Sequence, residues 1–152
     1  MSASLSPRQE IWRGLLLGQR SMLTGLASEL KKDYGLTVAA YEALLSLWEA
    51  PEHTLQATQL AHSLVYSSGS ASNLIGRLVQ AGHVVRRAGA HDARIVEVSL
   101  TPRGRDLVER ATKAHRASIA REFEPLVADA EIATLLAFAR RLAEREGVTA
   151  AP

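Results

Sequence analysis

The residues with the clearest chemical potential lie between His53 and His91. This acid-free stretch contains no Asp or Glu, although the whole chain has 16 acidic residues. It contains three arginines and a series of short polar side chains: Arg77, Arg86, Arg87, Ser67, Ser68, Ser70, Ser72 and Asn73. A surface that lacks carboxylates and offers short hydrogen-bonding groups suits a polyanion. We therefore expect the rest of the chain to be a scaffold that presents this stretch.

Composition excludes several other kinds of site. The formal net charge is only +2, so the local absence of acids indicates more than the global charge does. The chain has no cysteine, which excludes disulfides, thiolate metal sites and thiol-based redox sensing in it. With 152 residues, of which 47% are hydrophobic, the chain is expected to form one domain, or one compact unit with a helical extension.

Targeting and membrane signals are not visible in the sequence. No apolar run approaches the roughly 18 residues that a membrane span needs. Residues 1–10 have neither the basic nor the apolar region that is typical of a signal peptide. We therefore expect a cytoplasmic protein that does not bind membranes.

The histidines and the nucleophilic residue types do not form the patterns of an active site. His53, His62, His83 and His91 fall in the acid-free stretch, but no two are spaced i, i+4 and no carboxylate lies among them. We expect no metal and no other cofactor. The histidines are better explained as helix-end or surface residues, some of them, such as His91, near phosphate. Because a nucleophile elbow, a paired-carboxylate arrangement and a Gly-rich phosphate loop are missing, we do not expect an enzyme.

Helical periodicity and cap residues predict six helices. In order, they run from Pro7 to Gly35, from Thr37 to Pro51, from Thr54 to Leu64, from Ser67 to Gly82, from Thr101 to Pro125 and from an N-cap at Asp129 onward. Between the fourth and the fifth, the apolar period changes to two. His83–Arg87 and Arg94–Leu100 are therefore predicted strands that flank a Gly-containing turn, which makes a β-hairpin.

This order of elements indicates a winged helix-turn-helix, a mainly α fold with a small β-hairpin wing. In such a fold the second helix of the pair lies in the major groove of DNA, with its N-terminal residues at base edges. The residues predicted to read bases are Ser68, Ser70, Ser72 and Asn73, on the helix that Ser67 caps. Those predicted to bind phosphate are Arg77 and, at the start of the preceding helix, Thr54 and Gln56.

The predicted hairpin carries its own basic residues. Arg94 follows the turn and suits a narrow minor groove, which concentrates negative potential. Asp92 lies two residues away, and we expect it to orient the Arg94 guanidinium through a bidentate pair. A purely structural clamp of the turn is the alternative. Arg86 and Arg87 alternate along a strand, so only one of them is expected to face DNA, and an ordinary exposed strand is the alternative for both.

Several motifs occur in the order and spacing of one known family. They are Gln59-Leu60-Ala61, then Arg77-Leu78-Val79-Gln80-Ala81-Gly82-His83-Val84, then Asp92-Ala93-Arg94, and then Leu100-Thr101-Pro102-Arg103-Gly104. Together they resemble the MarR family of bacterial transcriptional regulators. The chain departs from that pattern in two places, because members often have a basic residue where Asn73 stands and an acidic one where Gly76 stands.

The resemblance implies a homodimer that binds a pseudo-palindromic operator and, as a repressor, is released by a small ligand. Residues 1–36 and 102–148 would form a helical dimerisation region, and residues 37–101 the DNA-binding winged helix-turn-helix. The wide apolar faces of the terminal helices agree with a partner chain, since they exceed what packing within one monomer needs.

Three aromatic residues admit two interpretations. Trp12, Tyr41 and Trp48 recur at helical spacing, so core packing explains them. The resemblance to the MarR family offers a second interpretation, in which they line a pocket for a small aromatic or anionic effector and Arg13 or Arg20 pairs with its negative group.

Two rival functions stay open at this stage. A winged helix used only for protein–protein contact predicts binding that is insensitive to salt, and an architectural DNA binder predicts salt-sensitive binding without sequence preference.

Overall fold

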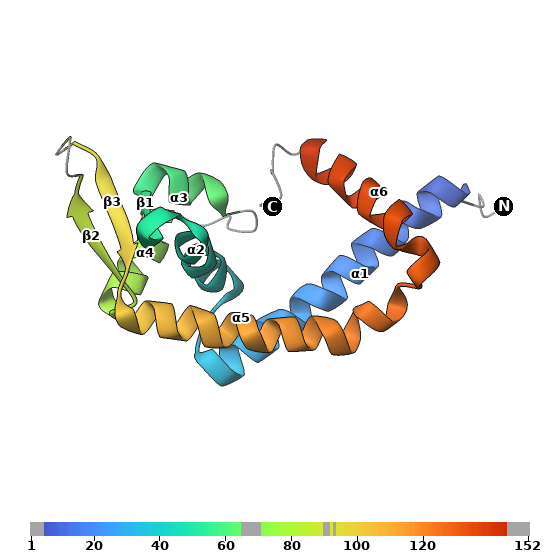
Figure 1. Ribbon diagram of the computed structural model, residues 1–152, viewed down its shortest axis with the longest axis horizontal. Coiled ribbons are helices and arrows are strands. Elements are labelled where there is room, and N and C mark those ends of the chain that lie inside the picture. The colour runs from blue at the N-terminus through green and yellow to red at the C-terminus, as the bar shows by residue number, and fades with distance from the viewer. Residues whose placement is uncertain (1–4, 65–70, 90–91, 93, 146–152) are drawn as a thin grey trace. The chain divides into compact units, whose positions relative to one another are not determined.

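The computed structural model describes residues 5–64, 71–89, 92 and 94–145. The chain divides into two compact units, Met1–Lys113 and Ala114–Pro152. The first unit contains the winged helix-turn-helix, and the boundary between the units falls within a long helix, α5 (Pro102–Glu122). The predicted fold class is confirmed: the chain is mainly helical and carries a small antiparallel wing (Figure 1).

The first predicted helix is present and ends at Gly35 as predicted, but its last turn is π-helical. Helix α1 (Pro7–Glu29) begins at Ser6, whose hydroxyl accepts a hydrogen bond from the Gln9 N–H at 3.4 Å. The helix then continues as one π-helical turn, Leu30–Tyr34. Gly35 follows with a φ of 66°, in the left-handed region where glycine has no steric penalty. The period of the apolar residues does not reveal the wider π turn.

Helix α2 (Val38–Glu49) forms where its cap and its apolar period predict it. Thr37 is the N-cap, and its hydroxyl accepts from the Ala40 N–H at 3.1 Å. Ala43, Leu44 and Leu47 are fully buried on one face. The helix ends at a turn, Pro51–His53, in which Glu52 and His53 both have positive φ.

The predicted start of the third helix at Thr54 is wrong. Thr54–Gln56 is a short strand, β1, and helix α3 (Ala57–Ser63) begins after it. Strand β1 pairs antiparallel with β3, with Thr54 opposite Ser99 and the two hydroxyl oxygens 2.8 Å apart. A strand of three residues has no visible period, and its partner lies more than forty positions away. The wing therefore has three strands in the order β1-β3-β2 rather than two.

The helix and the hairpin that follow match their predictions. Helix α4 is described over Ala71–Gln80, and Gly82 after it has a φ of 74°. Strands β2 (Val84–Ala88) and β3 (Val96–Leu100) pair antiparallel, with Arg87 opposite Glu97. The predicted N-cap at Ser67 lies outside the described residues.

The core of the first unit is shared by the helices and by strands β2 and β3 of the winged helix-turn-helix. Its fully buried large side chains are Leu30, Leu44, Leu47, Leu60, Ile75, Val84, Val98 and Val108. They come from the π-helical turn, α2, α3, α4, β2, β3 and α5. Because this core is shared, α4 and the wing are held by the same apolar contacts that hold the long helices' ends.

The second unit consists of the end of α5, two short 3₁₀ turns (Glu124–Leu126 and Asp129–Glu131) and helix α6 (Ile132–Arg145). Asp129 is not the cap it was predicted to be. The cap position is Ala128, whose N–H is bound by the Glu131 carboxylate at 3.1 Å. Among the described residues, no helix is long and apolar enough to cross a membrane.

Candidate nucleic-acid interface

Helix α4 separates an apolar face from a polar one. Leu74, Ile75 and Leu78 are buried in the core, at 3%, 1% and 4% exposure. Ser72, Asn73 and Arg77 are exposed, so the three described residues of this helix that were predicted to contact DNA do point away from the core. Ser67, Ser68 and Ser70, predicted for the same surface, lie outside the described residues, as does His91.

The start of α3 presents only one of the two residues that were predicted to bind phosphate there. The Thr54 hydroxyl is hydrogen-bonded to Ser99 and to the Glu52 carbonyl at 3.2 Å, and Thr54 does not begin a helix. Gln56 is the N-cap residue of α3, and its N–H is bound by the side chain of Gln59 at 3.0 Å. The premise for phosphate binding by Thr54 is therefore removed, whereas Gln56 keeps its place at a helix start.

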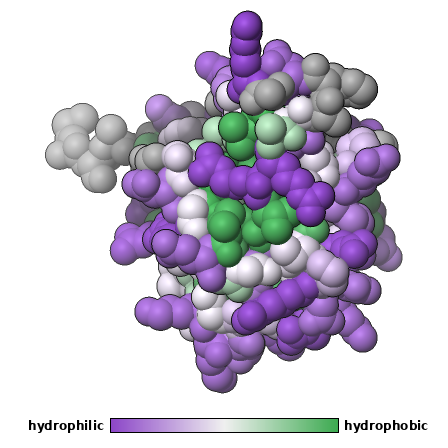
Figure 2. All heavy atoms as spheres, turned by 90° about the vertical axis from the view of Figure 1, so that its left-hand side faces the viewer, coloured by the Kyte–Doolittle hydropathy of each residue, from purple (hydrophilic) through white to green (hydrophobic). Residues whose placement is uncertain are grey.

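Both strand arginines of the wing are exposed. Along β2, Val84 is buried and Val85 half-buried, whereas Arg86, Arg87 and the next residue are exposed. Only the base of the hairpin is covered by other elements, so side chains on both of its faces reach solvent further out. Arg86 and Arg87 still point to opposite sides of the strand. Figure 2 shows hydrophilic side chains over most of this end of the molecule, with apolar residues visible between them.

The wing tip corrects the predicted pairing of Asp92 and Arg94. The Asp92 carboxylate accepts a hydrogen bond from the main-chain N–H of Arg94 at 2.9 Å. Among the described residues it makes no ion pair with the Arg94 guanidinium. Two main-chain bonds close the same turn, from the Gly89 N–H to the Ile95 carbonyl at 2.8 Å and from the Ile95 N–H to the Asp92 carbonyl at 3.0 Å. Arg94 itself is exposed.

The base of the wing is tied to the start of α5, which sequence reasoning noted only as a helix cap. The Thr101 hydroxyl donates to the Gly82 carbonyl at 2.8 Å and accepts from the Gly104 N–H at 3.0 Å. The Thr101 N–H also binds the His83 carbonyl at 3.0 Å. The motif Leu100-Thr101-Pro102-Arg103-Gly104 was visible in the sequence, but its contact with residues 82 and 83 is not local and was missed.

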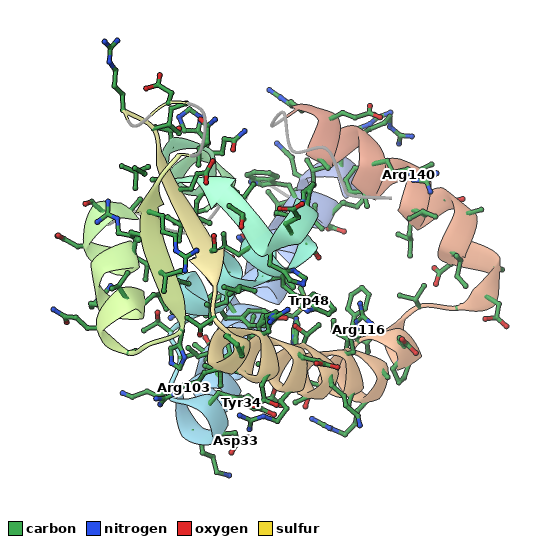
Figure 3. The ribbon with its side chains drawn as sticks, turned by 60° about the vertical axis from the view of Figure 1, so that its left-hand side comes forward. Asp33, Tyr34, Trp48, Arg103, Arg116 and Arg140 are labelled. Atoms are coloured by element: carbon green, nitrogen blue, oxygen red, sulfur yellow. The ribbon has the colours of Figure 1, made fainter. Side chains whose placement is uncertain are left out.

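His83 lies at this junction and has an altered pKa. Burial, and secondly the Arg103 guanidinium at the start of α5 (Figure 3), hold the pKa of His83 below its ordinary value of 6.5. Its Nδ1 atom is buried and has no hydrogen-bond partner among the described residues. Neutral His83 is therefore the form that fits the fold.

The predicted effector residues occupy different environments. Tyr41 is buried in the core at 4% exposure, with its hydroxyl oxygen 3.2 Å from that of Thr112, and Trp48 packs against the same core. Trp12 is 59% exposed on α1, and Arg13 and Arg20 are exposed on the same helix. Core packing therefore accounts for Tyr41 and Trp48, and does not account for Trp12.

Comparison with known proteins shows which family the chain resembles. The sequence profile described as "MarR family" matches residues 34–95, which include α2, α3, α4 and the wing as far as Ile95. AbsC, a MarR family transcriptional regulator from Streptomyces coelicolor, has a crystal structure that superposes with a TM-score of 0.83 at 27% identity. The match covers 97% of this chain and 100% of AbsC. The chain therefore resembles the MarR family in the sequence of its winged helix-turn-helix and in its fold.

Two further relatives show how far the similarity extends along the chain. The organic hydroperoxide resistance transcriptional regulator of Bacillus subtilis is 32% identical over 97 residues, which cover 59% of this chain and 65% of that protein. A second MarR family regulator from Streptomyces coelicolor, solved in complex with DNA, has a TM-score of 0.81 at 23% identity. That match covers 95% of this chain and 91% of the other, and at this identity it shows the MarR fold alone.

The chain spans only part of the curated relatives that it matches, 65% of the Bacillus subtilis protein and 50% of the regulator SarZ of Staphylococcus epidermidis. The MarR family is one of transcriptional regulators and not of enzymes, which agrees with the expectation from the sequence.

Proposed function

We propose that the chain is a sequence-specific DNA-binding transcriptional regulator that acts as a homodimer on a pseudo-palindromic operator. The observation that carries this proposal is the exposed face of α4, where Ser72, Asn73 and Arg77 stand in a stretch without acidic residues. Such a face offers hydrogen bonds and positive charge to a polyanion and repels none of its phosphates. A structural relative from Streptomyces coelicolor with the same fold was solved in complex with DNA, which supports DNA as the partner.

The residues divide by the part of the duplex that each would contact. Asn73 is placed to read adenine through a bidentate amide contact, and Ser72 to add a weaker hydrogen bond to a neighbouring base. Ser68 and Ser70 belong to the same proposed reading surface. Arg77, one turn later, and Gln56 at the start of α3 would bind phosphate, which positions the helix without reading sequence.

The wing would supply the remaining contacts. Arg94 at its tip would enter a minor groove, and Arg86 or Arg87, with His91, would contact the backbone. Because Arg86 and Arg87 point to opposite sides of β2, only one of them can face the same duplex.

A homodimer is supported by the apolar residues that both terminal helices expose. Helix α1 has no buried residue, and six of its large apolar side chains are 39–59% exposed: Ile11, Trp12, Leu15, Leu16, Leu17 and Met22. Helix α6 likewise exposes Ile132, Leu135, Leu136 and Leu142 at 43–49%. Exposed apolar surface of this extent is characteristic of an interface with another chain, and closed two-fold dimers are the commonest solution.

Sedimentation of two matched variants tests the dimer. Leu135→Asp places a charge on the apolar face of α6, whereas Thr134→Asp places the same charge well away from that face. We expect Leu135→Asp to sediment as a monomer and Thr134→Asp as a dimer. A dimer that survives Leu135→Asp, at a concentration where Thr134→Asp is also dimeric, would exclude this face of α6 from the interface.

Regulation by a small effector completes the proposal. In a dimer, the two copies of α4 must be spaced to match successive major grooves of B-DNA. A ligand that binds better to a conformation with another spacing would release the regulator from its operator. The regulator would then act as a repressor. Trp12, Arg13 and Arg20 are the exposed residues proposed for an aromatic or anionic effector, whereas Tyr41 and Trp48 belong to the core. Since the chain has no cysteine, an organic hydroperoxide signal could not be read here through a thiol.

Salt dependence of duplex binding tests the DNA contact itself. For the unsubstituted chain, log affinity should fall with log salt by about 0.9 for each phosphate neutralised. Arg77→Ala should flatten this slope by about two such steps per dimer, whereas Lys32→Ala, which removes one exposed charge outside the proposed interface, should leave it unchanged. If the affinity does not change with salt concentration, the partner of this surface is a protein and not DNA.

A further inference from the structure

Helix α4 carries a glycine in the middle of the face that the proposed function directs at DNA. At about 100° per residue, Gly76 lies on the side of the helix opposite the buried Leu74 and Leu78. Asn73, three residues before it, and Gln80, four residues after it, are both exposed. Any molecule that binds α4 through this face therefore passes close to residue 76.

Nothing in the described fold requires a glycine at residue 76. Its φ is not positive, unlike those of Gly35 and Gly82. Apart from its chain neighbours and the backbone of α4, a Cβ at Gly76 would meet no described atom within 4 Å, whereas one at Gly104 would overlap the His83 carbonyl. Glycine destabilises the interior of a helix relative to alanine. The reason for Gly76 is therefore to be sought in a partner that approaches this face closely.

An exposed apolar side chain follows Gly76 by three residues. Val79 is 37% exposed, and it is the one large apolar residue of α4 that faces solvent in the part of the helix that the structure describes. Asn73, Gly76 and Val79 are spaced three apart, so they are neighbours along one ridge of the helix. This ridge presents an amide, an open gap and an apolar wall, in that order.

We infer that the gap at Gly76 takes the methyl group of a thymine in the major groove, with Val79 as its apolar wall. The thymine methyl is the apolar group that base edges present in that groove, and apolar side chains contact it. Asn73 and Gly76 are about 4.5 Å apart along the helix axis, which is close to the step of about 3.4 Å between bases. The thymine therefore lies at or next to the base pair that Asn73 reads. This inference rests on the proposed function, because it assigns a second base contact to the same reading helix.

Uracil in place of thymine removes this methyl group and keeps the base pair. The probe is the duplex that the unsubstituted chain enriches from a random pool, synthesised with 2′-deoxyuridine in place of one thymidine of the half-site at a time. At one position we expect the affinity to fall about fourfold when one half-site is changed, and about 15-fold when both are. This is the loss expected when one buried methyl group is removed from each half-site.

Gly76→Ala fills the gap with a methyl group of the same size as that of thymine. It should bind the thymine duplex about tenfold more weakly than the unsubstituted chain does, because the two methyl groups overlap. It should bind the uracil duplex at least as tightly as the thymine duplex, so that the preference for thymine is lost or reversed.

Gly25→Ala is the matched control for this substitution. Gly25 is an exposed glycine of α1, and a Cβ there likewise meets nothing within 4 Å. Both variants should gain thermal stability through helix propensity, so unfolding cannot explain weaker binding by Gly76→Ala. Gly25→Ala should keep the fourfold preference for thymine in each half-site.

Val79→Ser tests the apolar wall. It should reduce the preference for thymine over uracil at the same position and leave the preference at the base that Asn73 reads unchanged. The assignment is overturned if no single replacement of thymine weakens binding. It is also overturned if Gly76→Ala loses the same affinity for the thymine and uracil duplexes, since that result indicates a displaced helix and not a filled gap. Failure of the unsubstituted chain to enrich any duplex would instead contradict the proposed function, and the assignment with it.

Discussion

Substitution of Gly104 by alanine probes the junction on which the wing depends. A Cβ at this position would overlap the His83 carbonyl oxygen and lie 2.9 Å from the carbonyl carbon. Since non-bonded atoms have their optimal contact at about 3.5 Å, the start of α5 would have to move away from residue 83. That movement separates α5 from the backbone at the base of β2. Because the clash is with backbone atoms, no side-chain rotation can relieve it.

The change in the free energy of unfolding has three contributions, of which two destabilise the fold and one stabilises it. Overpacking costs about 1–3 kcal/mol. Movement of α5 also weakens the bonds that Thr101 makes to residues 82 and 83, each worth about 1 kcal/mol. Alanine gains about 1 kcal/mol over glycine in helix propensity. The expected net destabilisation is about 2–3 kcal/mol, or roughly 5–10 °C in Tm for a chain of this size.

The assay is thermal unfolding of Gly104→Ala beside Gly76→Ala. Gly76 is also a helical glycine, but a Cβ there would meet nothing within 4 Å. We expect Gly76→Ala to raise Tm by about 2–4 °C through propensity alone. If Gly104→Ala melts at or above the temperature of the unsubstituted chain, the close packing of α5 on His83 is refuted.

Three further predictions use the same chain. Arg94→Ala should weaken duplex binding by about tenfold or more while leaving the sedimentation of the dimer unchanged, and unaltered affinity would remove the wing from the interface. Asn73→Ala should relax the preference at one base step in each half-site, whereas a uniform loss across all sequences would make Asn73 a backbone contact. Because the folded pKa of His83 lies below 6.5, the unfolded chain binds its proton first as pH falls, so the free energy of unfolding should decrease below pH 6.5. His83→Gln should reduce that decrease in urea unfolding measured across pH, and an identical pH profile would contradict the assignment.

Local chemistry was enough to predict most of the elements. Thr37 and Thr101 are caps because their hydroxyls accept from N–H groups three residues later, which depends on neighbouring sequence alone. Gly35 and Gly82 mark helix ends because both need positive φ. The division of α4 into a buried and an exposed face followed from its apolar period.

The errors came from contacts between distant residues. Strand β1 exists because Thr54 pairs with Ser99, and three residues carry no period of their own. The predicted pair of Asp92 with a guanidinium was wrong, because the Asp92 carboxylate accepts from the Arg94 main-chain N–H, which a short side chain reaches with less loss of entropy. Trp12, Tyr41 and Trp48 share a residue class but not an environment, because burial depends on the tertiary core.

The central claim, that this chain is a dimeric reader of DNA sequence, is tested most directly by selection of bound duplexes from a random pool at two salt concentrations. We predict enrichment of an inverted repeat whose half-sites lie about one helical turn apart, with total binding lower at the higher salt. Salt-sensitive binding without an enriched repeat would contradict sequence reading by α4, and binding at neither salt would contradict the DNA-binding function itself.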